Sequence, residues 1–241
     1  MVKFLIIQTA FIGDVILATP VIEKLHEFYP DSQIDFLLRQ GNESLLRNHP
    51  HVSNLLIWDK KKNKKKNMFR VIKVIRNKKY DYVINLQRFA STGIITAFSK
   101  GKIKVGFNKN PLSFLFTRRI SHEIGNGKHE VERNIETITE ITDHTSFNPK
   151  LYPSDEDYQI VSEYKMRPYV CIAPTSVWFT KQFPSGKWVE LINRIDTKYH
   201  VYLIGGPEDK TACDNIISKT DKSNIANLCG ELSLLQTSAL M

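Results

Sequence analysis

The 241-residue chain has few cysteines and no long apolar run. Its three cysteines, Cys171, Cys213 and Cys229, are odd in number and show neither CxxC nor Cys/His ligand spacing, so they indicate neither a disulfide framework nor a zinc site. No stretch approaches the roughly 20 apolar residues of a membrane span, and the opening MVKFLIIQ is too short for a secretory h-region. We therefore expect a cytoplasmic globular chain with buried thiols and no metal site.

Acidic residues are outnumbered, and the formal net charge is +9. Six lysines crowd the segment from Lys60 to Lys66. A run of this kind is usually a solvated loop, but it also attracts anionic lipid or nucleic acid. No aromatic residue interleaves with the lysines and no helix-turn-helix, RRM or zinc-finger pattern is present, so we expect no nucleic-acid partner. A solvated loop and a peripheral membrane contact both remain open.

Short apolar runs alternate with helical patterns along most of the chain, which predicts α/β structure with parallel sheets. The link Thr145–Tyr169 carries three prolines around a short polar helix, and we place the domain boundary within it. The prediction is a first Rossmann-like domain over residues 1–165 and a second over 166–241. The strands expected in the first domain are Val2–Ile7, Gln33–Leu38, Leu55–Trp58, Tyr80–Leu86 and Lys102–Val105. Those expected in the second are Tyr169–Ala173, His200–Ile204 and Ile225–Leu228.

Asp14 follows the first predicted strand and opens a helical pattern. Ligands of open α/β sheets bind outside the carboxyl ends of the strands, where this turn lies. An acid at such a position is either a helix cap or a catalytic group, and position alone favours the cap. Pro20 predicts that the helix restarts there, with Thr19 available as a cap.

Four segments in the same order resemble the heptosyltransferase-like glycosyltransferases of family 9. They are Gly13-Asp14-Val15-Ile16-Leu17-Ala18-Thr19-Pro20, His129-Glu130-Val131-Glu132-Arg133, Pro174-Thr175-Ser176-x-Trp178-x-x-Lys181-x-Phe183-Pro184-x-x-x-Trp188, and Gly205-Gly206-Pro207-Glu208. The resemblance implies a GT-B fold of two Rossmann-like domains, an acceptor on the first domain and a nucleotide sugar on the second. It also implies inverting transfer of heptose from ADP-heptose to an anionic glycolipid, the lipopolysaccharide inner core.

The resemblance assigns roles to individual residues. Asp14 becomes the general base, and no metal or cofactor other than the nucleotide-sugar co-substrate is required. The implied donor-binding residues are Thr175, Ser176, Lys181, Gly205, Gly206, Glu208 and Met241. The implied acceptor-binding residues are Gly13, Gln87, Arg88, His129 and Arg133.

Structural alternatives accompany several of these assignments. Lys181 without its motif would be an exposed loop lysine, Gly205-Gly206 a sharp turn, and His129 a surface or core histidine. The aromatic residues around Lys181 are expected to pack about the loop. Asn85 stands where the family often has an acid, which argues against a charged role there.

The last residues predict a helix opened by a capping box of Ser233 and Gln236. The family continues into an Asp-Ser/Thr-Gly-Pro-x-His segment that this sequence lacks, so we expect a truncated second domain. Leu234, Leu235 and Leu240 are then expected to be partly uncovered and to promote self-association. The alternative function is an inactive fragment that only binds acceptor or acts as a scaffold.

Overall fold

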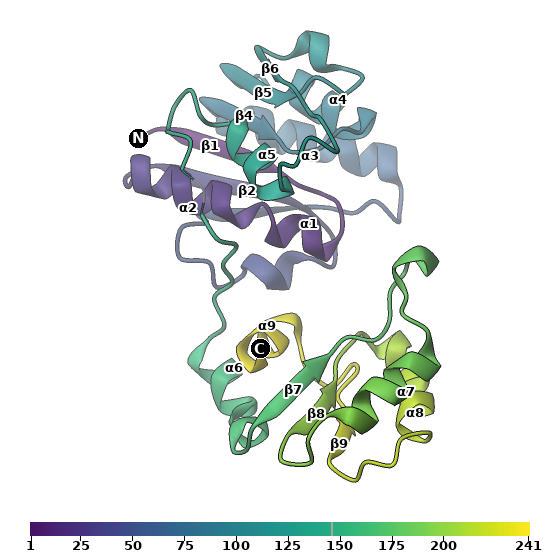
Figure 1. The fold of residues 1–241 in the computed structure, drawn as a ribbon. Helices are drawn as coiled ribbons and strands as arrows, with labels where there is room; N and C mark the ends of the chain where they lie inside the picture. The colour runs from purple at the N-terminus through teal and green to yellow at the C-terminus, as the bar shows by residue number, and fades with distance from the viewer. Residues whose placement is uncertain (146) are drawn as a thin grey trace. The chain divides into compact units, whose positions relative to one another are not determined.

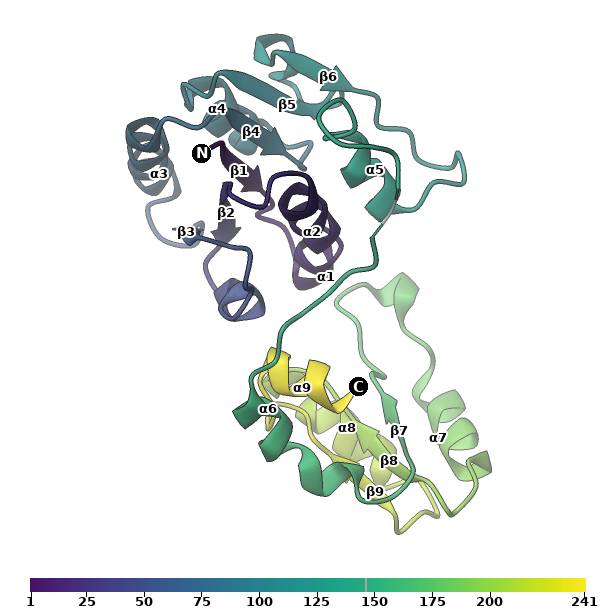
Figure 2. The same cartoon turned by 90° about the vertical axis from the view of Figure 1, so that its left-hand side faces the viewer.

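The computed structural model describes residues 1–145 and 147–241, which form two compact units, Met1–Tyr152 and Pro153–Met241. The boundary therefore lies earlier than the predicted residue 165. The reason is that α6 (Asp155–Ile160) and the following 3₁₀ turn (Ser162–Lys165) pack against α9 (Leu234–Leu240) of the second unit, as Figure 2 shows. Val161, between them, is fully buried in that contact.

The first unit contains a six-stranded parallel sheet in the order β3-β2-β1-β4-β5-β6 (Figure 1). Its strands are β1 (Lys3–Ile7), β2 (Gln33–Arg39), β3 (Asn54–Trp58), β4 (Tyr82–Asn85), β5 (Ile103–Phe107) and β6 (Arg118–Ile120). The five predicted strands are present with ends shifted by a few residues. The sequence analysis missed β6, because three residues that include two arginines carry no strand pattern.

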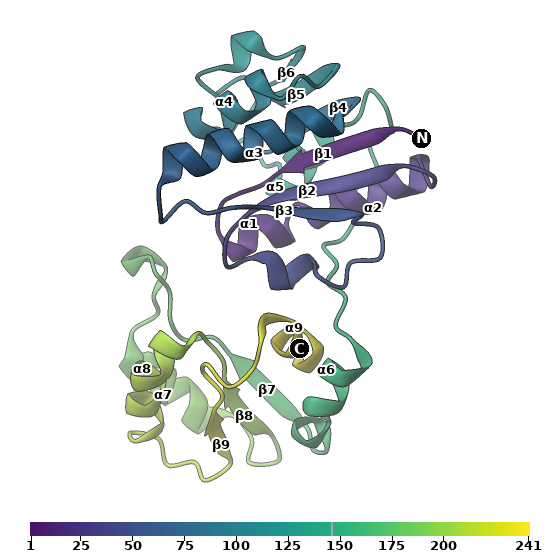
Figure 3. The ribbon, with the colours of Figure 1, turned by 180° about the vertical axis from the view of Figure 1, so that it is seen from behind.

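Helices cover both faces of this sheet (Figures 1 and 3). They are α1 (Ile12–Ile16), α2 (Thr19–Phe28), α3 (Lys64–Lys78), α4 (Ala90–Phe98) and α5 (Glu130–Glu136). Helices α1, α2 and α5 lie on one face, and α3 and α4 lie on the other. Under α3 the core contains Met68, Val71, Ile72 and Ile75 packed on strand residues such as Trp58.

Two helix predictions are corrected at their ends. The break before Pro20 is present, but Thr19 is not the cap, because it is the first residue of α2 and Ala18 occupies the N-cap position. The Thr19 hydroxyl donates to the carbonyl of Ile16 at 2.8 Å and accepts from Lys150 N at 2.9 Å. The sequence from residue 129 to 142 predicts one helix, but the regular helix α5 ends at Glu136. Beyond it, the hydroxyls of Thr137, Thr139 and Thr142 donate to carbonyls of the preceding turn, an interaction that competes with regular helix.

The second unit has a three-stranded parallel sheet in the order β7-β8-β9. Its strands are β7 (Tyr169–Ile172), β8 (His200–Leu203) and β9 (Ile225–Asn227), and its longer helices are α7 (Ser185–Arg194) and α8 (Lys210–Ile217). Cys213 and Cys229 are buried as expected, with their Sγ atoms 3.2 Å apart as free thiols, whereas Cys171 is only partly buried. Burial raises the pKa of Cys213 to about 12, so this thiol is unreactive at neutral pH.

The predicted capping box that opens α9 is present. Ser233 Oγ accepts from Gln236 N at 3.2 Å, and Gln236 Oε1 accepts from Ser233 N at 2.8 Å. The expectation that Leu235 and Leu240 are uncovered is wrong, because both are buried, and Leu240 packs in a cluster with Val161 and Tyr202. Leu234 is partly exposed, as expected. The apolar edge on which the predicted self-association depended is therefore largely covered within the chain.

Candidate functional site

All six strands of the first unit are parallel, so their carboxyl ends share one edge of the sheet. The strand order reverses between β1 and β4, which makes the loops that follow these two strands the place where such sheets bind ligands. These loops carry Gly13 and Asp14 after β1, and Gln87 and Arg88 after β4. Four of the sequence-predicted site residues therefore lie at one topological switch point.

Buried amides hold the two loops together. Gln87 Nε2 donates to Gln8 Oε1 at 2.6 Å, and Gln87 Oε1 accepts from Thr9 Oγ1 at 3.0 Å. Asn110 Nδ2 donates to the carbonyls of Gln87 and Phe89 at 3.0 and 3.1 Å. Gln87 is only 5% exposed, and both polar atoms of its side chain have partners. It therefore positions the loops, and its expected contact with the acceptor stays a prediction.

Asp14 lies in the first turn of α1 and is partly exposed. Its Oδ2 accepts from the backbone N–H of Phe11 at 3.1 Å, so the capping role is present. Among the described residues Oδ1 accepts no hydrogen bond, which leaves one carboxylate oxygen for a ligand hydroxyl. The capping and catalytic interpretations are therefore compatible, because the cap fixes the direction of the carboxylate. Gly13 beside it is exposed, and a Cβ there would meet no atom within 4 Å.

Lys60 differs from the rest of its lysine run. Its Nζ donates to the carbonyl of Thr9 at 2.8 Å and lies 4.8 Å from the ring centroid of Trp58. Burial, with smaller contributions from Lys64 and Arg39, lowers the pKa of Lys60 to about 8. The run therefore includes one lysine directed at the β1 loop, which the sequence could not distinguish from its solvated neighbours.

The segment after β6 and helix α5 carry further ionisable residues near the carboxyl edge of the first sheet. His129 caps α5, with Nδ1 accepting from Val131 N at 3.3 Å, so the structural alternative describes it. Arg133 donates from Nε and Nη2 to Glu130 Oε2 at 2.9 and 2.8 Å, and part of its fork is thereby occupied. Arg88 is exposed. Burial, followed by the charge of Arg88, lowers the pKa of His122, a residue that the sequence analysis did not select.

In the second unit the loop after β7 carries Thr175, Ser176 and Lys181. Lys181 ends a short 3₁₀ turn and is exposed, and among the residues described it makes no ion pair. Packing of the predicted kind is present for Phe183 and Trp188, whose ring centroids are 5.1 Å apart and nearly perpendicular. Trp188 Nε1 also donates to the carbonyl of Pro174 at 3.2 Å. Trp178 departs from the expectation, because it is 58% exposed.

The turn after β8 contains Gly205, Gly206 and Glu208. Gly206 N donates to Asp209 Oδ2 at 2.8 Å, and a Cβ on Gly205 would lie 2.8 Å from the same oxygen, so close packing requires glycine there. Gly230 lies opposite with a φ of +76°, and a Cβ there would lie 2.8 Å from Pro207 Cα. The sharp-turn interpretation is thus correct for Gly205, while Glu208 remains exposed and available. Met241 is 75% exposed.

The described residues contain no group of three or more His, Cys, Asp or Glu side chains placed to hold a metal ion. An Asp-x-Asp pattern is present at Asp155 and Asp157, but it forms the first turn of α6, where Asp157 Oδ2 accepts from the N–H and hydroxyl of Ser154. Within the described part of the chain, no helix has the length and apolarity needed to cross a bilayer.

Residues that the sequence analysis missed are buried or paired over long separations. Gln8, Thr9 and Asn110 are each at most 2% exposed. Together with Gln87 they form a buried polar layer beneath the loops after β1 and β4, which we call the amide floor. Asn85, at the end of β4, accepts from Gln87 N at 2.9 Å, and its Nδ2 has no partner among the described residues. Only the polar composition of the segments after β1 and β4 indicated such a floor.

Comparisons with known proteins agree with this geometry. Residues 68–241 match the profile of glycosyltransferase family 9 (heptosyltransferase). Lipopolysaccharide heptosyltransferase 3 of Escherichia coli is 28% identical over 96% of this chain and 72% of its own length. A family 9 glycosyltransferase structure from Veillonella parvula superposes with a TM-score of 0.86 at 20% identity, covering 99% of this chain and 72% of that one. The structure of E. coli heptosyltransferase WaaC with ADP gives a TM-score of 0.72 at 21% identity, covering 99% and 77%.

The structural likeness confirms the GT-B-type α/β fold of two parallel-sheet units. The profile match covers well over half of the sequence, and it includes every segment of the predicted motif set except the one with Asp14. That segment falls within the stretch shared with the E. coli relative, which spans 96% of the chain. The chain belongs to glycosyltransferase family 9, the heptosyltransferase family.

Proposed function

We propose that this protein is an inverting glycosyltransferase that moves heptose from ADP-heptose to the lipopolysaccharide inner core in the cytoplasm. The observation that carries the proposal is the carboxylate of Asp14, held by its cap at the switch point of the first sheet with one oxygen free. The names of the relatives support the donor and acceptor, since one is a lipopolysaccharide heptosyltransferase and another was solved with ADP.

Asp14 would remove the proton of the attacking acceptor hydroxyl. Attack on the anomeric carbon from the face opposite the ADP leaving group forms the new C–O bond as the old one breaks, and this inverts the configuration. The buried amide floor supports such a role, because it keeps the loop after β1 in one position while the substrate changes.

The developing negative charge on ADP would be stabilised by Lys181, with Thr175 and Ser176 as hydroxyl donors from the same loop. A charge-assisted contact to phosphate is typically worth about 1.5–3 kcal/mol. Glu208 would accept from ribose hydroxyls, with Met241 as a further donor contact. No metal or other cofactor is part of this scheme.

The acceptor would meet the cationic residues of the first unit. Arg88 is exposed and Lys60 is directed at the β1 loop, so a phosphorylated glycolipid finds positive charge beside Asp14. His129 and Arg133 would also bind the acceptor, although their present contacts hold α5. The lysines from Lys60 to Lys66 would also contact the anionic inner face of the membrane.

The test is transfer of heptose from ADP-heptose to a purified inner-core acceptor, comparing the wild type with Asp14→Asn. The asparagine oxygen can still accept from Phe11 N, so the melting temperature should change by no more than a few degrees. Turnover should fall by about 10²–10⁴, the usual contribution of a general base. Asp31→Asn, an exposed acid before β2, is the matched control and should keep full turnover.

Lys181→Ala separates donor from acceptor binding. It should weaken ADP binding about tenfold or more in a calorimetric titration and leave acceptor binding unchanged. Retention of more than about a tenth of turnover by Asp14→Asn would refute the general-base role. A wild-type chain that binds acceptor without any transfer would support the alternative, an acceptor-binding or scaffold domain.

A further inference from the structure

The outer face of α3 has an unusual composition for a surface helix. The helix contains seven Lys or Arg residues and no Asp or Glu. Met68, Val71, Ile72 and Ile75 face the core, which leaves the charged residues toward solvent. Phe69 stands among those charges and is 64% exposed, and Val74 is 40% exposed. Figure 3 shows the helix lying lengthwise over its face of the sheet.

Most of the charges on α3 form no ion pair with the described residues of the chain. Lys78 pairs with the buried Asp35 at 2.8 Å, but none of the other six cations of α3 has a carboxylate within 4.0 Å in the described part of the chain. Lys64, Lys65 and Lys66 occupy the first turn, where the helix dipole disfavours positive charge. The first turn is therefore built against the preference of the helix dipole, and this indicates an external anion as the partner of these charges.

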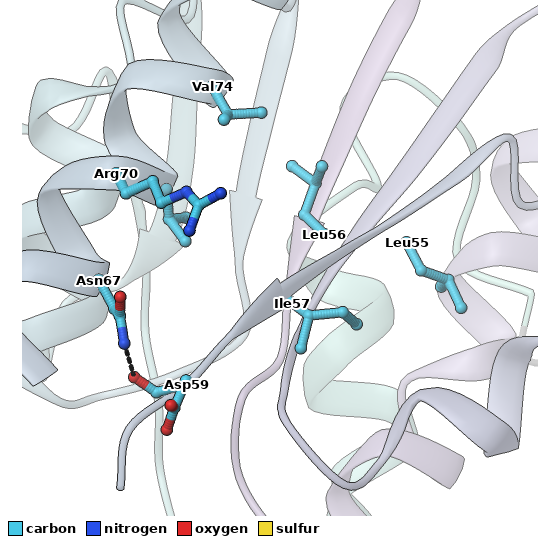
Figure 4. A pocket seen from close by; sticks show the side chains of 8 residues that line it. Leu55, Leu56, Ile57, Asp59, Asn67, Arg70 and Val74 are labelled. Atoms are coloured by element: carbon cyan, nitrogen blue, oxygen red, sulfur yellow. Dashed lines mark hydrogen bonds between the residues drawn. The ribbon is translucent and has the colours of Figure 1, made fainter. Parts of the chain in front are cut away.

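A groove lined by both apolar and polar side chains, Asp59 and Asn67 among the polar ones, lies beside the charged face. It has a volume of about 370 Å³ and separates α3 from β3, which is the edge strand of the sheet. Leu56 and Ile57 of β3 and Val74 of α3 line it, and Arg70 reaches across it from the helix (Figure 4). A cationic helix face that also exposes aromatic and aliphatic side chains is the pattern of a surface that lies in a membrane interface.

We propose that the outer face of α3 docks on an anionic phospholipid bilayer. Phe69 and Val74 enter the boundary between headgroups and acyl chains, while Arg70, Lys73 and Arg76 reach the headgroup phosphates with their long side chains. A nucleic acid would use the cations but leaves Phe69 and Val74 without a purpose. A neutral peptide strand added to β3 would leave the cations unused.

This surface extends the membrane contact beyond the loop from Lys60 to Lys66, and it deepens the proposed function. The N-terminal end of α3 adjoins the candidate acceptor site, since Trp58 Nε1 donates to the carbonyl of Lys64 at 3.4 Å and Lys60 Nζ donates to that of Thr9. A bilayer on α3 therefore brings its headgroup layer alongside the loop of Asp14, where a lipid-anchored acceptor would present its sugars.

The experiment is flotation of the full chain with vesicles, without donor or acceptor, so that its result does not depend on transfer activity. Vesicles of phosphatidylcholine alone are compared with vesicles that include phosphatidylglycerol. The wild type should bind only the anionic ones. Changing Arg70, Lys73 and Arg76 together to Gln should lower binding on the order of 100-fold, since each basic residue near the surface contributes about 1 kcal/mol.

The matched control changes the exposed Lys109, Lys165 and Lys219 to Gln, which removes the same net charge elsewhere. Its binding should stay within about threefold of the wild type, because only residues near the surface contribute strongly. Phe69→Ser should lose about tenfold and should matter most at high salt, where the electrostatic contribution is screened. Circular dichroism checks that each variant is folded.

Equal losses in the two triple variants would overturn the proposal, because binding would then follow net charge and not this face. No effect of Phe69→Ser at any salt concentration would overturn the insertion of α3. Single-stranded RNA that displaces the vesicles and loses binding through the same three residues would assign the face to nucleic acid instead.

Discussion

Lys60 offers a prediction in which stability and function change in opposite directions. Its pKa is lowered from 10.5 to about 8, so at pH 7 the folded state holds a charge that burial disfavours. A shift of this size corresponds to about 3 kcal/mol, at about 1.4 kcal/mol per pKa unit. Because the side chain is partly exposed, solvent screening reduces that value. A Lys60→Met variant removes the cost of this buried charge, but it also loses the hydrogen bond to Thr9, which reduces the gain in stability by a further ~1 kcal/mol.

We therefore expect Lys60→Met to raise the free energy of unfolding at pH 7 by about 1 kcal/mol. The sign with pH follows from linkage: between pH 8 and 10.5 the unfolded wild type binds more protons than the folded one, so wild-type stability rises with pH over that window. The advantage of the variant should shrink accordingly. Urea unfolding followed by circular dichroism at pH 7 and 9.5 measures both values.

Lys62→Met is the control, because Lys62 is exposed within the same run. It should not change stability measurably at either pH. If Lys60 also contacts the anionic acceptor, Lys60→Met should raise the KM for acceptor while it stabilises the fold. A Lys60→Met protein that is less stable than wild type at pH 7, or whose difference from wild type does not change with pH, would refute the reasoning.

Two further predictions concern stability. Burial, together with the charges of His51, Lys150 and His26, lowers the pKa of His49 from 6.5 to about 3. The neutral form of His49 therefore contributes stability that is lost as pH falls from 6.5 toward 3. His49→Gln should flatten the decline of the unfolding free energy over this window, whereas the exposed control His144→Gln should leave that slope unchanged. Gly230→Ala should lower the unfolding free energy measured in urea by about 2–3 kcal/mol, because φ at Gly230 is +76° and the new Cβ would lie 2.8 Å from Pro207 Cα. In the control Gly186→Ala the new Cβ meets no atom within 4 Å, so this change should be neutral or slightly stabilising. Equal effects of the two changes would contradict this account.

The sequence predicted the fold better than the site. Apolar runs such as Val2–Ile7 mark buried parallel strands, and their alternation with helices leaves few topologies open. By contrast, β6 is short and charged, and it exists because it pairs with β5, a contact that no local pattern encodes.

The candidate site shows why residue roles are harder to predict. Gln87 looked like a ligand contact, yet its partners Gln8 and Thr9 are far away in sequence and bury it. Lys60 is identical in type to its neighbours, and only the fold turns it toward Thr9. Asp14 could be placed at the sheet edge from the sequence, but whether it caps α1 or faces a ligand depends on which carboxylate oxygen is occupied.

The floor beneath the loops of β1 and β4 is made of groups that do not titrate. Gln8, Thr9, Gln87 and Asn110 keep the same charge at every pH that the fold survives. Their hydrogen bonds persist unchanged while Lys60, beside the loop that follows β1, gains or loses its proton. The candidate site therefore separates shape from protonation: a change of pH alters the charge that the site presents without altering the positions of its loops.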